Sequence, residues 1–313
     1  MEFLLQSGKI PGIDGTALHY TLSTPTSKVE KSELPSGVCL VFCNGVGMNT
    51  GLWQHFLEYF RPQISTLIWD YRGHGLSEFP KDFDSLTIEH HAEDLQIIAK
   101  ELRIQDMVLI GHSMGVQVIL EAYRLFPERI RALIPICGSF RNPLKTFFYT
   151  HLFEYAFPLL YRTVTDHADF LNPIWKSFSR TPLAEQVVTW MGTNPSMVKP
   201  RDLRPYLENL QSVDLELFFN ALKGATEHSA AGMLKGIQIP VLVTAGEWDH
   251  FTPLSESKRM AQEIPGAELF VIPHGSHCGL LDQPEMLNLK VEKFLSKHLQ
   301  NPRNPPAKNS PET

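Results

Sequence analysis

The sequence lacks the charge pattern of a protein that binds nucleic acid. Lys and Arg number 28 against 34 Asp and Glu, which gives a formal net charge of −6. A chain with this balance has no basic field that would attract nucleic acid or an anionic membrane. We therefore expect neither as a partner.

Long hydrophobic runs are also missing. The most apolar stretch, residues 147–161, is interrupted by His151, Glu154 and Pro158. It is shorter than the ~20 residues that a membrane-spanning helix needs. The first residues, MEFLLQSGKIPGIDG, contain neither the basic region, nor the apolar core, nor the small-residue cleavage site of a secretory signal. These absences favour a cytoplasmic protein without a stable membrane anchor.

Cysteine is scarce, and its spacing fits no zinc site. The chain has four cysteines, Cys39, Cys43, Cys137 and Cys278. The first two fall within one apolar run, and reduced core thiols are the expected state in a cytosolic protein. The histidine pairs His90–His91 and His274/His277 have no third or fourth ligand at zinc-like spacing. We therefore predict no metal site.

What the sequence does contain is a regular alternation of two patterns. Apolar runs typical of buried strands occupy residues 37–43, 65–70, 106–111, 131–137, 239–246 and 267–273. Stretches with apolar residues at helical spacing occupy residues 91–104, 114–126, 255–264 and 285–299. Strands that are apolar along their whole length and alternate with helices indicate a mostly parallel central sheet with helices on both faces. The predicted fold class is therefore α/β.

The alternation is interrupted between residues 141 and 235, where no strand pattern occurs. This segment is rich in aromatic residues and contains scattered prolines, which predicts several short helices. We interpret residues 1–140 and 236–300 as one α/β core and residues 141–235 as a helical cap inserted into it. Residues 301–313 have the composition of a disordered tail.

The stretch VLIGHSMGVQVIL, residues 108–120, places Ser113 between a predicted strand and a predicted helix. Glycines stand two positions before it and two positions after it. A serine on such a sharp turn has its oxygen exposed above the sheet, and larger side chains at the glycine positions would crowd the turn. We therefore consider Ser113 a candidate nucleophile, with a structural turn serine as the alternative.

A serine hydroxyl is a weak nucleophile until a neighbouring base takes its proton, and the base needs a carboxylate to orient it. Asp249 follows the predicted strand 239–246, and His277 follows the predicted strand 267–273. Because parallel strands end at the same edge of a sheet, both residues should lie at the edge that holds Ser113. We predict that Asp249 is the acid and His277 the base.

Other residues compete for both roles. Glu247 is offset from the expected acid position, and Asp214 lies in the predicted cap. His250 and His274 are the rival bases. His274 follows its strand directly, where the loop has barely cleared the sheet, so we expect a loop or pocket-edge residue there.

Four segments, in this order along the chain, resemble the α/β-hydrolase superfamily. DYRGHGLSE is similar to a loop common in these enzymes, GHSMG to their nucleophile elbow, GEWDHFTP to their acid loop and GSHCGLLDQPE to their histidine loop. The resemblance covers residues 10–299 and is weak across the predicted cap. It implies the α/β-hydrolase fold and the catalytic roles given above. We expect Asp70 and Arg72, in the first of these segments, to brace their loop and not to touch substrate.

The same resemblance implies an oxyanion hole formed by two backbone N–H groups, those of Val46 and Met114. Many relatives carry His-Gly where this chain has Asn44-Gly45, in the stretch VFCNGVGMN. Because the donors are backbone groups, we expect the asparagine to spare catalysis.

The function expected from this pattern is hydrolysis of carboxylic esters through an acyl-enzyme intermediate, without a cofactor. The aromatic cap of low charge indicates a small lipophilic ester or acyl substrate, as for a carboxylesterase or lipase. Serine at the elbow excludes relatives with a carboxylate there, such as haloalkane dehalogenases and epoxide hydrolases. A C–C bond hydrolase, a perhydrolase and an acyltransferase would use the same residues. A hydrolase-like protein that only binds a small ligand is the alternative from another class. The sequence gives no indication of the number of subunits.

Overall fold

The computed structural model describes residues 3–26 and 34–299. Its centre is an eight-stranded sheet in the order β1-β2-β4-β3-β5-β6-β7-β8. The pairs from β4 to β8 in this order are parallel, whereas β1 with β2 and β2 with β4 are antiparallel. The sheet is therefore mostly parallel, as predicted.

The six predicted strands are present, with small shifts at their ends. They are β3 (Val38–Cys43), β4 (Ser65–Trp69), β5 (Asp106–His112), β6 (Ile130–Ile136), β7 (Leu242–Gly246) and β8 (Glu268–Ile272). Every residue of β3, β5 and β7 except the first of β5 is buried, because helices cover both faces of the sheet.

The first two strands, β1 (Phe3–Pro11) and β2 (Ala17–Pro25), were not predicted from the sequence. They pair in antiparallel register from Phe3↔Pro25 to Pro11↔Ala17, and β2 joins the sheet through β4. Most side chains of β1 are exposed, so this strand has no run of buried apolar residues. A search for apolar runs cannot find a strand of this kind.

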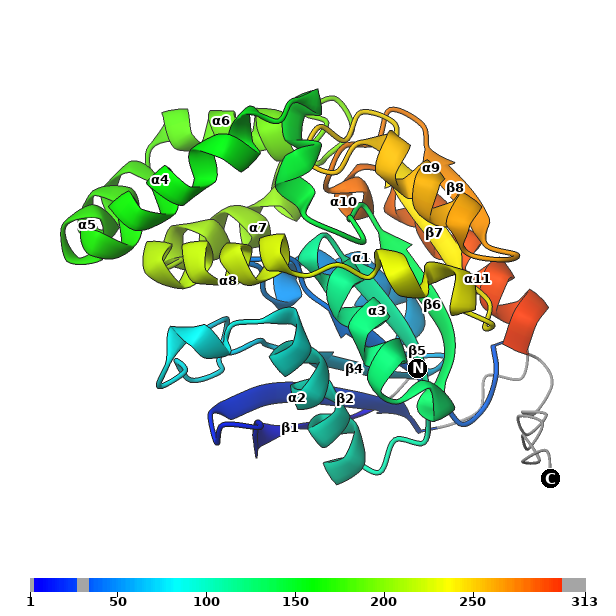
Figure 1. Ribbon diagram of the computed structural model, residues 1–313. Helices are drawn as coiled ribbons and strands as arrows, with labels where there is room; N and C mark the ends of the chain where they lie inside the picture. The colour runs from blue at the N-terminus through cyan, green and yellow to red at the C-terminus, as the bar shows by residue number, and fades with distance from the viewer. Residues whose placement is uncertain (1–2, 27–33, 300–313) are drawn as a thin grey trace, which may run out of the picture.

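Helices pack on both faces of the sheet (Figure 1). One face carries α2 (Ile88–Glu101), α3 (Met114–Leu125) and α9 (Leu254–Glu263), and the other carries α1 (Gln54–Phe60) and α11 (Pro284–Leu299). Alternate residues of β3 serve the two faces: Cys39 and Val41 join the α2–α3 side, and Leu40 and Phe42 join the α1–α11 side. The four predicted helices are present, whereas α1 and the short α10 (Gly279–Asp282) were not predicted.

Between β6 and β7 the described chain forms helices and no strand. The helices are α4 (Leu152–Asp166), α5 (Ala168–Phe178), α6 (Pro182–Gly192), α7 (Pro200–Ser212) and α8 (Leu215–Glu227). We call residues 141–235 the cap segment. Figure 1 shows its long helices as a group beside the α/β part. The division into a core and an inserted cap stays an interpretation, and the predicted tail, 301–313, lies outside the described residues.

Short 3-10 turns complete the described elements, at Thr50–Trp53, Phe83–Ser85, Pro127–Arg129, Pro143–Lys145, Phe147–Tyr149 and Ala231–Gly236. Within residues 3–26 and 34–299, none of the helices has the length and apolar character needed to cross a bilayer.

Candidate active site

Ser113 lies on the turn between β5 and α3. Its backbone has φ 55° and ψ −117°, a conformation that residues with a side chain rarely adopt. A Cβ on Gly111 would collide with the carbonyl oxygen of Gly115, and a Cβ on Gly115 would collide with that of Cys43. Both glycines are therefore needed for the strand and the helix to approach this closely. A strained residue held by such packing is typical of a functional site.

Asp249 and His277 are hydrogen-bonded to each other in the loops after β7 and β8. His277 Nδ1 is 3.0 Å from Asp249 Oδ2. The buried Asp249 carboxylate also accepts the backbone N–H groups of Phe251 and Thr252 and the Thr252 hydroxyl, at 2.8–2.9 Å. Burial opposes ionisation, but His277 and the Thr252 donors outweigh it and hold the pKa of the Asp249 carboxyl below its usual value. An ionised Asp249 keeps the proton of the neutral imidazole on Nδ1, so that Nε2 is the basic nitrogen.

Asp282 holds the loop that carries His277. Its Oδ2 accepts the Ser276 N–H at 2.5 Å and the Ser276 hydroxyl at 2.6 Å, and its Oδ1 accepts the Asn194 N–H at 3.0 Å. Asn194 belongs to the cap segment and also donates from its side chain to the His274 carbonyl. The cap segment therefore helps to fix the His277 loop. This role of Asp282 was not predicted from the sequence.

The two predicted oxyanion donors come from different parts of the chain: Val46 lies in the loop after β3, and Met114 directly follows Ser113. Val46 lines the same cavity as Ser113. Met114 is the first residue of α3, where a backbone N–H has no partner within its own helix. The role of both N–H groups stays a prediction.

Asn44, the departure from the superfamily pattern, is a fully buried packing residue. Its Nδ2 donates to the Trp69 carbonyl at 3.1 Å, and its Oδ1 accepts the Trp53 indole N–H at 2.7 Å. These bonds tie the start of the Val46 loop to β4 and to the turn before α1.

Ser113 and His277 line one cavity of about 360 Å³. Most of its wall is apolar, and much of that wall comes from the cap segment, including Phe147, Phe153, Phe157, Phe218 and Phe219. Several cap aromatics thus line a pocket, whereas Trp175, Phe178 and Trp190 do not. A concave apolar site with a few polar groups is the usual form of a small-molecule site. We call Ser113, Asp249 and His277 the Ser113 site.

Ser113 and His277 are not hydrogen-bonded to each other in the described part of the chain. Such contacts are often long in catalytic sites before substrate is bound. The structure therefore joins Asp249 and His277 directly and brings Ser113 and His277 together only as walls of one cavity.

His112 is a site residue that the sequence analysis missed. Its Nε2–H donates to the His277 carbonyl at 2.9 Å, and the two ring centroids are 4.9 Å apart. Burial, and then the positive charge that His277 can carry, lower the pKa of His112 to about 3. His112 is therefore a neutral ring that positions the backbone of His277. The only feature of the sequence that could have indicated a role for His112 is its position directly before Ser113.

The rival acids and bases have other partners. Glu247 accepts the backbone N–H of His274 at 2.8 Å, and both side chains are exposed. Asp214 caps the N-terminus of α8. His250 is exposed, and its ring stacks on Phe148. All four rivals are described residues, and none of them lines the cavity at Ser113.

Asp70 and Arg72 brace their loop, as predicted. Arg72 is fully buried and donates two hydrogen bonds of 2.7 Å to Asp94 in α2. Asp70 accepts the Leu76 N–H at 3.1 Å, and its carbonyl accepts the Ser77 hydroxyl at 2.7 Å.

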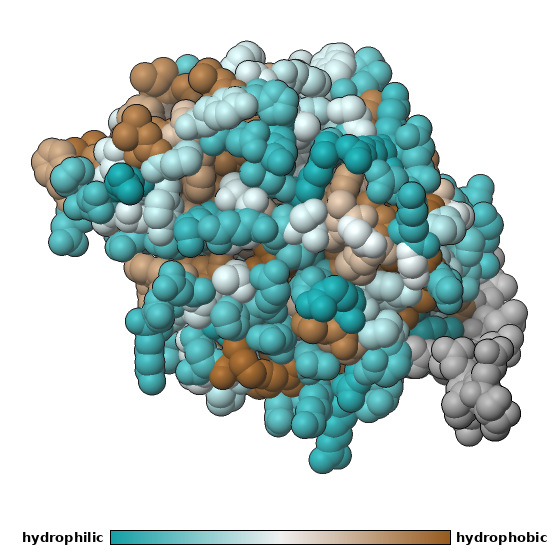
Figure 2. Space-filling view, viewed as in Figure 1, coloured by the Kyte–Doolittle hydropathy of each residue, from teal (hydrophilic) through white to brown (hydrophobic). Residues whose placement is uncertain are grey.

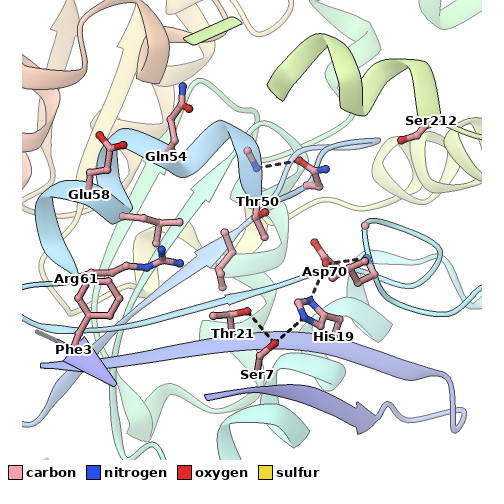
Figure 3. A pocket seen from close by; sticks show the side chains of 16 residues that line it. Phe3, Ser7, His19, Thr21, Thr50, Gln54, Glu58, Arg61, Asp70 and Ser212 are labelled. Carbon is pink, nitrogen blue, oxygen red and sulfur yellow. Dashed lines mark hydrogen bonds and ion pairs between the residues drawn. The ribbon is translucent and has the colours of Figure 1, made fainter. Parts of the chain in front are cut away.

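A larger, open cavity of about 890 Å³ lies beside the N-terminal hairpin (Figure 3). In the described chain it shares no lining residue with the cavity at Ser113. Its wall holds a hydrogen-bonded row in which Ser7 Oγ is 3.0 Å from His19 Nε2, and His19 Nδ1 is 3.1 Å from Asp70 Oδ2. We call these three residues the Ser7 cluster. Neither Ser7 nor His19 was predicted from the sequence to be a site residue.

The parallel sheet, the strained serine after β5 and the acid and histidine after β7 and β8 together define an α/β hydrolase. The family model of the α/β hydrolase fold matches residues 38–284. The chain belongs to this family.

Known relatives and solved structures agree with this assignment. Protein ABHD8 of Homo sapiens is 28% identical over 265 residues, which are 82% of this chain and 55% of that protein. The chain thus spans about half the length of this relative. The 3-oxoadipate enol-lactonase 2 of Acinetobacter baylyi is 24% identical, over 82% of this chain and 88% of the enzyme. A thermophilic esterase from Thermogutta terrifontis has the same fold, with a TM-score of 0.73 and 22% identity, over 94% of this chain and 99% of the esterase.

Proposed function

We propose that this protein is a serine hydrolase that cleaves carboxylic esters with an apolar acyl group through an acyl-enzyme intermediate. One observation carries the proposal. Ser113 stands on a strained turn, and it lines the same apolar cavity as His277, whose Nδ1 is bound to the Asp249 carboxylate. A positioned base beside a serine held on such a turn is the arrangement that nucleophilic acyl transfer needs.

In the proposed acylation step, His277 Nε2 takes the hydroxyl proton of Ser113 while Oγ forms a bond to the ester carbonyl carbon. The carbonyl oxygen becomes an oxyanion, which accepts the backbone N–H groups of Val46 and Met114. The bond from carbon to the leaving oxygen then breaks, and the imidazolium of His277 gives that oxygen its proton. The products of this step are a free alcohol and an acyl ester on Ser113.

Deacylation repeats the sequence with water. His277 Nε2 takes one proton of the water as its oxygen attacks the acyl carbon, and the same proton then returns to Ser113 Oγ as the carboxylic acid leaves. Asp249 stays ionised throughout and stabilises the imidazolium, which agrees with the lowered pKa of its carboxyl. No step uses a cofactor.

The cavity supports an apolar acyl group as the part of the substrate that is recognised. Side chains of Phe147, Phe157 and Phe219 form its wall, and those of Ser113 and His277 are among its few polar groups. A charged group placed there would lose its hydration without gaining a partner. The names of two relatives, an enol-lactonase and an esterase, also indicate cleavage of an ester bond, because a lactone is a cyclic ester.

The test is hydrolysis of p-nitrophenyl esters from acetate to palmitate by the wild type and by Ser113→Ala. We expect turnover by the wild type, best with an acyl chain that fills the cavity, and a loss of roughly 10⁴-fold or more in kcat for the variant. A folded wild type that cleaves none of these esters would contradict the proposal and would favour a C–C bond hydrolase, an acyltransferase or a ligand-binding protein.

A further inference from the structure

Large apolar side chains gather on the outer side of three consecutive helices of the cap segment, α4, α5 and α6. Of the twenty large hydrophobic side chains that the described residues expose, ten lie on these helices. Four of the ten are more than two-thirds exposed, namely Tyr155, Leu159, Phe170 and Trp190. Figure 2 shows apolar surface gathered at this end of the molecule. A concentration of this kind marks a surface that meets a partner.

The exposed side chains form stripes along α5 and α6. Phe170, Ile174 and Phe178 recur at intervals of four on α5. On α6, Leu183, Val187 and Trp190 recur at intervals of four and three. Both spacings place the side chains on one side of a helix. Each helix therefore presents a continuous apolar stripe to the outside.

The inner sides of α4 and α6 form part of the wall of the cavity at Ser113. Val188 and Met191 line it from α6, and Phe157 lines it from α4. Leu160 belongs to both surfaces, because it lines the cavity and is 47% exposed. The apolar outer surface is therefore continuous with the apolar cavity.

This face carries almost no net charge. Residues 152–192 contain three basic residues, Arg162, Lys176 and Arg180, and four acidic residues, Glu154, Asp166, Asp169 and Glu185. Anionic membranes are recognised by clusters of basic residues, which this segment does not have. In charge, the face matches a surface that is itself neutral.

We propose that the outer face of α4, α5 and α6 docks on an uncharged lipid–water surface, from which ester substrates enter the cavity at Ser113. The entry of substrate rests on the proposed ester hydrolysis, whereas the docking can be measured without it. An ester with an apolar acyl chain partitions from water into lipid, so its concentration is highest where the face docks. Exposed aromatic and aliphatic stripes are sufficient for a lipid surface. A protein partner would also need hydrogen-bonding groups around an apolar centre.

The test measures binding of the full chain to vesicles of dioleoylphosphatidylcholine by flotation. The face variant is Phe170→Ser with Trp190→Ser, two exposed residues that do not line the cavity. The matched control is Leu4→Ser with Leu289→Ser, which removes two exposed apolar side chains on β1 and α11. We expect the wild type and the control to float with the vesicles, and the partition coefficient of the face variant to fall about tenfold or more. Hydrolysis of soluble p-nitrophenyl butyrate should be equal in all three proteins.

Several outcomes separate the two proposals. Lost flotation of the face variant with normal butyrate hydrolysis supports docking. A wild type that hydrolyses butyrate but does not float overturns docking alone. Flotation without hydrolysis of any ester overturns the proposed function and, with it, the entry of ester substrates. Binding only to vesicles that contain phosphatidylglycerol contradicts a neutral surface. Dimers of the wild type that the face variant loses, together with no flotation, would assign the face to a second copy of the chain.

Discussion

The Ser113 site and the Ser7 cluster contain the same three residue types, and the Ser7 cluster is the better connected of the two. Its hydrogen bonds link serine to histidine at 3.0 Å and histidine to aspartate at 3.1 Å. In the Ser113 site only histidine and aspartate are linked, at 3.0 Å. If contact alone defined a catalytic serine, the choice would fall on Ser7.

The direction of the hydrogen bonds leads to the opposite choice. The Ser7 hydroxyl donates to the Tyr20 carbonyl at 3.1 Å, so this carbonyl competes with His19 Nε2 for its single proton. A hydroxyl that donates to a backbone carbonyl does not present its proton to the neighbouring imidazole. In the Ser113 site, the ionised Asp249 holds the proton on the other ring nitrogen of His277 and leaves Nε2 basic.

The backbones of the two serines differ as well. Ser7 lies opposite Thr21 in the regular antiparallel ladder of β1 and β2. Ser113 has a positive φ and immediately precedes α3, and the N-terminus of a helix is a general site for binding an anion. A nucleophile is thus defined by its turn, the donors beside it and a basic nitrogen, and three residues in contact are not sufficient.

The largest expected difference between the sites is their reaction with a fluorophosphonate, which forms a bond from serine Oγ to phosphorus and releases fluoride. We expect one label per chain, on the peptide that contains Ser113. Ser113→Ala should lower the labelling rate roughly 10⁴-fold or more, because among the described serines Ser113 is the one we expect to be activated. Ser7→Ala should label as fast as the wild type. Mass spectrometry of the labelled peptide gives the answer, and a label on Ser7 would reverse the ranking of the two sites.

The acids should differ by a similar but smaller factor. Asp249→Asn is expected to lower kcat by about 10³–10⁴-fold, because the amide no longer holds His277 with its basic nitrogen toward the cavity. Asp70→Asn should leave kcat and KM unchanged, since Asp70 only braces a loop and contacts His19. Steady-state kinetics on one ester compare the pair, with thermal unfolding to establish that both variants fold. Equal losses in the two variants would mean that Asp249 acts through stability alone.

The part of the fold that positions the site could be predicted from the sequence, because its strands are buried on both faces. A strand such as β3 is apolar at every position, so a search for apolar runs in the sequence finds it directly. The exposed strand β1 gives no such signal, and its place in the sheet depends on pairing with β2, which is a long-range contact. The Ser7 cluster depends on that pairing and therefore could not be predicted from the sequence.

Within the site, the sequence predicted the residues whose loops follow buried strands. Asp249 and His277 meet as expected, because β7 and β8 are parallel neighbours. His112 and Asp282 were not predicted because they act through hydrogen bonds to backbone groups, at His277 for His112 and at Ser276 and Asn194 for Asp282. Apolar runs and superfamily motifs give no signal for contacts of this kind.

The smallest expected effect is on the pH dependence of the free energy of unfolding, and it comes from His112, the neutral ring beside the Ser113 site. The unfolded chain protonates this histidine as the pH falls through about 6.5, whereas burial delays protonation of the folded chain until a pKa of about 3. The free energy of unfolding should therefore decrease as the pH falls from 6.5 toward 3. His112→Gln should make this decrease shallower, by at most about 1.4 kcal/mol per pH unit.

Urea unfolding between pH 7 and pH 5 measures this slope. Part of the slope should remain in the variant, because burial also lowers the pKa of His74 and His91. His167→Gln, a change of an exposed histidine in the cap segment, is the matched control and should leave the slope unchanged. If His112→Gln and His167→Gln have the same slope as the wild type, His112 is not held neutral by the fold. His112 would then be charged in the folded protein while it donates its hydrogen bond to the His277 carbonyl.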